Sequence, residues 1–201
     1  MTNSELEFWF DFASPYAYVS SARLDDWISS AGIKVRWVPF LLGPVFKKQG
    51  WPTSPFNLYP LKGRYMWRDV ERLCERHKLG LTRPEEFPQL SLLATRVAVA
   101  GRDEDWLPAF CKRVFQAQFG LGENIADKQT IVGALAGLVD DPDYWLKQAV
   151  TAKTKQALVN RGVEAEQKGI FGAPSFVTLD GELFWGDDRL EQSIEWILRR
   201  R

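Results

Sequence analysis

Cysteine and histidine are scarce in this chain of 201 residues, which has two cysteines and one histidine. Cys74 and Cys111 form no CxxC pair, and His77 has no second histidine with which to bind a metal. Disulfide exchange and zinc binding depend on such pairs and clusters. We therefore expect no cysteine-based redox chemistry and no metal site, and we expect both cysteines to lie in the core.

An excess of charge of either sign is missing as well. The chain has 26 Lys and Arg residues and 26 Asp and Glu residues, so its formal net charge is zero. Domains that bind nucleic acid or anionic membranes usually have a basic surplus. The chain also has no run of about 18 apolar residues that would span a bilayer. These absences argue against nucleic acid and membranes as partners.

The N-terminal segment lacks the positive charge of a secretory signal. It is acidic at Glu5 and Glu7, and Asp11 interrupts the apolar run that begins at Phe8. A signal peptide needs a basic start followed by a longer apolar stretch. We therefore expect a cytoplasmic protein.

Aromatic residues are abundant, at 13% of the chain with nine tryptophans. This content predicts a thick aromatic core and is also compatible with an aromatic-lined pocket. The alternating, aromatic-rich segment 6–12 predicts a first strand. Ser14 and Pro15 follow it as a favoured N-cap and first helical residue, so a helix is expected from there to Gly32.

A second alternating segment, Val35–Pro39, predicts a strand parallel to the first, because so short a strand–helix–strand unit takes a right-handed crossover. From Leu42 to about Gly162 a loop rich in Gly and Pro gives way to apolar residues at helical spacing. We expect helices at Leu61–Lys78, Gln89–Gly101, Trp106–Phe119, Lys128–Leu138 and Tyr144–Asn160, with Asp127 and Asp143 as N-caps and Gly80, Gly101 and Gly162 as stops.

Strand signals return after Pro174. Ser175–Leu179 and Glu182–Trp185 flank an Asp-Gly dipeptide typical of a β-hairpin, and a last helix is expected from Asp188 to about Arg199. The predicted order is β-α-β, a helical block, then β-β-α. This is an α/β arrangement with the layout of the thioredoxin-like fold, in which residues 1–41 and 163–201 form the thioredoxin-like domain and residues 42–162 form an all-helical insertion.

Three motifs together resemble those of a known family. They are Phe10–Tyr18 (FDFASPYAY), Phe171–Phe176 (FGAPSF) and Trp185–Leu190 (WGDDRL). In order and spacing, over nearly the full length, the chain resembles the 2-hydroxychromene-2-carboxylate isomerase family, relatives of the kappa-class glutathione transferases. The resemblance implies a thioredoxin-like fold and glutathione as cofactor. Each motif alone is weak evidence, whereas the three jointly are specific.

Ser14 is the predicted catalytic residue. It stands at the helix start where thioredoxin-like redox proteins have a nucleophilic cysteine, and a hydroxyl there can donate to a bound thiolate with the help of the helix dipole. The resemblance implies that glutathione provides this thiol. Pro15 and Tyr16 would also contact the glutathione. The Ser-Pro pattern alone favours a Ser14 that only caps the helix. The two distant motifs favour the catalytic role instead.

Ala173 and Pro174 are the second predicted glutathione contact. In thioredoxin-like folds the proline at this place is cis and faces the start of the first helix. The N–H and C=O of the preceding residue, Ala173, are then open to a ligand's peptide groups. The alternative is an ordinary trans proline at the entry to a strand.

Trp185, Asp187 and Asp188 form the third predicted contact, between the last strand and the last helix. One acidic residue would cap that helix, and the other would receive the γ-glutamyl ammonium of glutathione. Family members commonly have an amide residue where Asp187 stands. Two capping acids without a ligand are the alternative.

Lys47, Asn57 and Lys62 are the predicted substrate-binding residues, since the family places polar groups for substrate and glutathione in this loop and the helix after it. A solvated charged face is the alternative for each cation. A buried carboxylate needs some positive partner.

The predicted function is glutathione-dependent isomerisation of a 2-hydroxychromene-2-carboxylate to its open-chain benzylidenepyruvate, a step in aromatic hydrocarbon catabolism. The substrate would be a small aromatic carboxylate, and a homodimer is the assembly to test. Two alternatives stay open: a kappa-like glutathione transferase that keeps the thioether as product, and a non-catalytic thioredoxin-like binding module.

Overall fold

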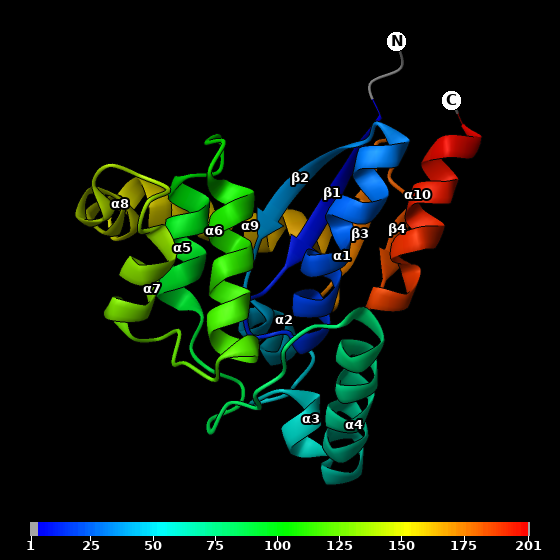
Figure 1. The fold of residues 1–201 in the computed structure, drawn as a ribbon, viewed down its shortest axis with the longest axis horizontal. Coiled ribbons are helices and arrows are strands. Elements are labelled where there is room, and N and C mark those ends of the chain that lie inside the picture. Colours follow the sequence, from blue (N-terminus) through cyan, green and yellow to red (C-terminus); the bar gives the residue numbers. More distant parts are fainter. Residues whose placement is uncertain (1–3, 201) are drawn as a thin grey trace.

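Four strands form one mixed sheet in the computed structural model of the chain, which describes residues 4–200 (Figure 1). The strands are β1 (Glu5–Phe10), β2 (Lys34–Pro39), β3 (Ser175–Thr178) and β4 (Leu183–Trp185), in the spatial order β2-β1-β3-β4. β1 pairs with β2 in parallel and with β3 antiparallel, and β4 is antiparallel to β3. The predicted β-α-β unit, the C-terminal hairpin and the thioredoxin-like arrangement are confirmed.

The central strand β1 is buried on both faces. Successive side chains of a strand point to opposite faces. Leu6, Phe8 and Phe10 therefore enter the larger core together with residues of α1 (Pro15–Ala31). Trp9 faces the other way and packs in a smaller core with residues of the segment that leads into β3. The aromatic content that the sequence shows is thus used on both sides of one strand.

The helical insertion lies between β2 and β3 in the sequence. Its helices are α2 (Leu42–Lys48), α3 (Pro55–Leu58), α4 (Pro60–His77), α5 (Leu92–Ala100), α6 (Leu107–Phe115), α7 (Lys128–Leu135), α8 (Pro142–Ala149) and α9 (Ala152–Gln167). A π-helical turn, Gln116–Gly120, extends α6, and a 3₁₀ turn, Asp187–Arg189, precedes α10 (Leu190–Arg199). No helix in the described part of the chain is both long and apolar enough to cross a membrane.

Local capping chemistry explains the ends of α1. The Ser14 hydroxyl accepts a hydrogen bond of 3.2 Å from the Ala17 N–H, and Pro15 is the first helical residue. Gly32 ends the helix in the left-handed region, at φ 59°, which glycine adopts without a steric penalty. The predicted N-cap, first residue and stop of this helix are confirmed.

Several predicted helix ends in the insertion are wrong. The proline-rich segment expected to be a loop contains α2 and α3, because Pro44 and Pro55 lie in first helical turns, where a missing N–H costs nothing. Asp141 caps α8 instead of Asp143, since Pro142 takes the first helical position. The helix expected over Tyr144–Asn160 is broken at Thr151, which caps α9.

Two of the three predicted glycine stops are also wrong. Gly162 lies inside α9. Lys78, with φ 55°, ends α4 two residues before Gly80. Gly101 ends α5 and Asp127 caps α7, as predicted. Cys74 and Cys111 are buried in the core, also as predicted.

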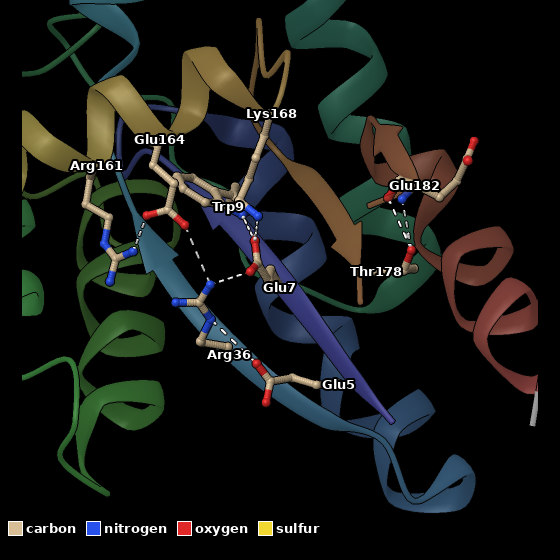
Figure 2. A network of polar contacts seen from close by, with 9 residues as sticks. All are labelled: Glu5, Glu7, Trp9, Arg36, Arg161, Glu164, Lys168, Thr178 and Glu182. Atoms are coloured by element: carbon tan, nitrogen blue, oxygen red, sulfur yellow. Dashed lines mark hydrogen bonds and ion pairs between the residues drawn. The ribbon is translucent and has the colours of Figure 1, made fainter. Parts of the chain in front are cut away.

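A polar network fastens α9 to the sheet (Figure 2). Glu7 of β1 accepts a hydrogen bond of 2.6 Å from the Trp9 indole, pairs with Arg36 of β2, and lies 3.4 Å from the Lys168 ammonium. Arg36 also reaches Glu164 of α9 at 3.7 Å. Burial alone would raise the pKa of Glu7, but the hydrogen bonds from Trp9 and Arg36 and the two positive charges lower it below its ordinary value.

Candidate active site

A cavity of about 1210 Å³ lies where the ends of the sheet meet the insertion. The thioredoxin-like part contributes the turn between β1 and α1, the segment before β3 and the turn after β4. The insertion contributes α2, the loop through α3, one face of α4 and the segment that leads into α5. The lining is mostly apolar, which suits a hydrophobic ligand with a few polar groups.

Ser14 lies in this cavity and joins two distant parts of the chain. Its hydroxyl accepts from the first turn of α1 and donates a hydrogen bond of 2.9 Å to the carbonyl oxygen of Ala173, 159 positions away. Its own N–H donates to the Asp11 carbonyl at 3.0 Å. The predicted catalytic hydroxyl is therefore only 4% exposed and has a fixed orientation.

The Ala173-Pro174 bond is cis, as predicted, and both residues line the cavity. The Ala173 carbonyl, expected to be open to a ligand, accepts the Ser14 hydroxyl in this structure. No residue in the described part of the chain accepts from the Ala173 N–H or from the Tyr16 N–H near the start of α1. These two N–H groups, close to Ser14, remain for a ligand.

Tyr16 lines the cavity from the first turn of α1. Its hydroxyl donates to Asp69 of α4 at 3.0 Å, and Asp69 pairs with Arg72 at 2.9 Å. Burial, with the charge of Asp69 adding to it, raises the pKa of Tyr16 well above its ordinary value. The phenol therefore stays protonated and ties α4 to the start of α1.

The end of β4 and the segment before β3 form an aromatic rim of the cavity. The ring centroids of Phe171 and Trp185 are 4.8 Å apart, and about half of each side chain is exposed. Gly172 lies beneath them: a Cβ atom there would come within 2.3 Å of the Trp185 indole nitrogen. The absence of a side chain at Gly172 therefore allows Trp185 its place at the rim.

Asp187 and Asp188 have different environments. Asp187 is buried, accepts a hydrogen bond of 2.8 Å from Ser20, and pairs with Arg23 at 2.7 Å. Burial raises the pKa of Asp187, although Arg23 and Ser20 oppose the shift. Asp188 is exposed and lies 3.2 Å from the Arg189 guanidinium.

Neither acidic residue has the predicted capping role. Arg189 is the N-cap residue of α10, without a side-chain hydrogen bond, because the 3₁₀ turn that contains Asp187 and Asp188 separates them from the helix. Both residues line the cavity. Of the two carboxylates, that of Asp188 is the one accessible to a ligand's ammonium group.

The structure brings only one of the predicted substrate-binding residues into the cavity. Lys62 lines it, with its ammonium 4.7 Å from the centroid of the Tyr59 ring. Lys47 is exposed on α2 and does not line the cavity. Asn57 lines a separate, smaller cavity and donates to the Phe87 carbonyl at 2.9 Å.

Asp11 is a site residue that the sequence analysis did not single out. It is 3% exposed, lines the cavity, and accepts hydrogen bonds from the Ala13 N–H (3.0 Å), the Leu42 N–H (2.7 Å) and the Ser91 hydroxyl (2.6 Å). Burial raises its pKa, and these three donors oppose the shift. One signal was present in the sequence: a lone acid between the apolar residues Phe10 and Phe12.

Comparisons with known proteins identify the family of this chain and its relatives. The family described as a DSBA-like thioredoxin domain matches residues 5–197. The 2-hydroxychromene-2-carboxylate isomerase of Sphingobium xenophagum is 28% identical over 92% of this chain and 94% of that protein. Human glutathione S-transferase kappa 1 is 26% identical over 92% of this chain and 87% of that protein.

A comparison of folds also finds an isomerase of this kind. The solved structure of a 2-hydroxychromene-2-carboxylate isomerase superposes with a TM-score of 0.86 at 22% identity, covering 98% of this chain and 97% of that one. The expected resemblance and thioredoxin-like fold are thus confirmed. The chain is related to isomerase and glutathione transferase enzymes.

Proposed function

Because the chain belongs to the DsbA-like thioredoxin family, we propose that it uses this site as a glutathione-dependent isomerase. It would interconvert 2-hydroxychromene-2-carboxylates and trans-o-hydroxybenzylidenepyruvates in aromatic hydrocarbon catabolism. The supporting observation is Ser14, which occupies the start of α1 and lines the cavity. Cys74 and Cys111 are buried elsewhere and do not line it. The thiol must therefore come with a bound molecule.

The residues present fit glutathione. Ser14 offers a hydroxyl at a helix N-terminus, and the N–H groups of Tyr16 and Ala173 are available for hydrogen bonds with sulfur or peptide groups. Asp188 offers an accessible carboxylate for an ammonium group. When bound, glutathione supplies a thiolate that adds to a conjugated double bond and leaves again after rotation about the resulting single bond.

Ser14 would favour the thiolate by turning its proton from the Ala173 carbonyl to the sulfur. A free thiol with a pKa of ~8.5 is only about 3% ionised at neutral pH. Lowering that pKa by ~2 units corresponds to about 2.7 kcal/mol. A hydrogen bond to a charged group stabilises it by ~1.5–3 kcal/mol, and the helix dipole adds ~0.3–1 kcal/mol. Together these two effects are large enough to lower the thiol pKa by that amount.

The rest of the cavity suits a small aromatic carboxylate. Phe46, Trp51, Phe56 and Phe87 line it and offer ring faces and edges to an aromatic substrate. Lys62 supplies a positive charge for the carboxylate, which would otherwise be costly to bury. Apolar walls also limit the access of water to the reacting double bond.

Catalytic use of glutathione distinguishes the isomerase from its alternatives. The enzyme is mixed with excess hydroxychromene carboxylate and a small amount of glutathione, and product absorbance and free thiol are followed together. We expect full conversion with the thiol intact, because each cycle returns it.

Other results would contradict the proposal. A loss of thiol equal to the substrate converted, with a stable thioether by mass spectrometry, would indicate a kappa-like transferase, the alternative that the relatives of that name favour. The absence of conversion would exclude this substrate and favour a non-catalytic binding module.

A further inference from the structure

A second cavity, of about 370 Å³, lies beside the proposed active site between α3, α4 and the segment that precedes α5. Phe56 and Phe87 line both cavities and so form the wall between them. The second cavity differs in character, because Arg64, Arg83 and Asn57 contribute polar groups to its lining. No step of the proposed reaction uses it.

The two guanidinium groups of this cavity have no acidic partner. Within residues 4–200, neither Arg64 nor Arg83 forms an ion pair. Elsewhere on α4, Arg68 pairs with Glu71 and Arg72 with Asp69, each three residues away. Arg64 and Arg83 are therefore free to pair with an anion from solution.

The cavity holds one of these groups in a defined orientation. The guanidinium of Arg83 lies 4.9 Å from the centroid of the Trp67 ring, and Trp67 in turn packs edge to face against Phe87 at 5.0 Å. Stacking on an aromatic face leaves the N–H groups at the edge of the guanidinium available for a planar or tetrahedral oxyanion.

Close packing of α3 on α4 forms the floor of the cavity. A Cβ atom at Gly63 would come within 2.3 Å of the Phe56 carbonyl oxygen, so only glycine permits this approach. The Asn57 side-chain amide donates to the Phe87 carbonyl at 2.9 Å and so links α3 to the segment that precedes α5. The arginines thus flank a formed cavity.

We propose that this cavity is a binding site for a small oxyanion, carried as a phosphate or carboxylate group on a polar ligand. Arg64 and Arg83 bind the anion, since guanidinium groups form paired hydrogen bonds with both kinds of group. Glu85 is the one acidic residue in the lining of this cavity. Its carboxylate weakens the binding of a bare anion without preventing it, and it suits a ligand that also has a hydroxyl or ammonium group.

The test is a calorimetric titration of the full chain, without glutathione, at constant ionic strength. Inorganic phosphate and succinate are the two probes, and binding of either one identifies the preferred group. We expect Arg64→Gln and Arg83→Gln each to weaken binding about tenfold. Arg83→Lys keeps the charge but loses the paired hydrogen bonds, so it should weaken binding too.

Two control variants separate a site from general charge attraction. Arg68→Gln removes the same charge from the same helix outside the cavity and should leave the affinity unchanged. Glu85→Gln removes the opposing carboxylate and should tighten binding. The proposal is overturned if neither probe binds, if Arg64→Gln and Arg83→Gln bind as well as the natural chain, or if Arg68→Gln weakens binding equally.

Discussion

Ser14 has two roles that can be separated at the scale of one residue. Its hydroxyl caps α1 and, in the proposed function, stabilises a thiolate. We expect Ser14→Ala to lose most turnover while the free energy of unfolding falls by only ~0.5–2 kcal/mol, the usual cost of an N-cap. Turnover, chemical denaturation and the ultraviolet absorbance of enzyme-bound thiolate are the measurements.

Ser21→Ala is the matched control for that variant. Ser21 is a buried serine of the same helix whose hydroxyl donates to the Tyr18 carbonyl, and it does not line the cavity. Its removal should leave the thiolate absorbance unchanged. An equal thiolate signal in Ser14→Ala and the natural chain would remove the role assigned to the Ser14 hydroxyl.

Substitution by alanine is expected to have opposite effects at Gly172 and at Gly162. At Gly172 a Cβ atom would meet the Trp185 indole, so we expect Gly172→Ala to displace this ring, alter tryptophan fluorescence and weaken glutathione binding. Gly162 lies inside α9 with nothing within 4 Å of a Cβ atom. Gly162→Ala should raise the free energy of unfolding by about 0.8–1.0 kcal/mol, the helix-propensity gain. Wild-type fluorescence and affinity in Gly172→Ala would contradict the packing argument.

Asp11 and Asp187 show why parts of the site could not be predicted from the sequence. The partners of Asp11 lie at Leu42 and Ser91, and Arg23, the partner of Asp187, is 164 positions away. No local pattern joins such residues, because tertiary packing alone brings them together. Ser14 could be predicted, since its capping chemistry is local and its family motif is contiguous.

At the scale of elements, the network around Glu7 determines how firmly α9 is held on the sheet (Figure 2). The folded state lowers the pKa of Glu7, so the stability it contributes is complete above the ordinary glutamate pKa. That contribution disappears as the pH falls through the lowered value. We expect Glu7→Gln to cost about 1.5–3 kcal/mol near neutral pH, and the difference from the natural chain to shrink in acid.

Denaturation curves at several pH values measure this difference. Glu166→Gln is the control: Glu166 is also on α9 and pairs with Lys48, but both side chains are more than half exposed. Exposed pairs contribute little, so its effect should be small at every pH. A Glu7→Gln difference that stays constant into acid would mean that the carboxylate charge has no part in the network.

The ends of a helix could be predicted where capping residues mark them in the sequence. Ser14, Pro15 and Gly32 define α1 by side-chain capping, proline geometry and a left-handed φ, all readable from the sequence. The break between α8 and α9 was missed because apolar spacing continues across it, while the Thr151 side chain caps a new helix. The prolines of the segment 44–60 suggested a loop, although Pro55 and Pro60 begin helices and Pro44 lies in a first turn.

At the scale of the whole molecule, the order of strands and helices could be predicted from the sequence, whereas most of the cavity could not. Strand alternation and the hairpin dipeptide indicated all four strands, and the three motifs indicated the fold. The cavity is different, since the insertion supplies many of its walls and their position depends on how α2, α3 and α4 pack. Lys47 illustrates this: it is near Lys62 in the sequence, yet only Lys62 faces the cavity. The division at residues 42 and 162 and the homodimer stay predictions.

The order of strands in the sheet has a consequence for synthesis on the ribosome. β1 is central, but its antiparallel neighbour β3 is made only after the whole insertion. Until Ser175–Thr178 emerges, one edge of β1 has no partner for its backbone groups, and Trp9 lacks Val177 in its core. Long-range pairing of this kind slows folding and exposes apolar surface meanwhile. A nascent chain that ends before β3 should therefore need a chaperone, whereas one that includes the hairpin can close its sheet.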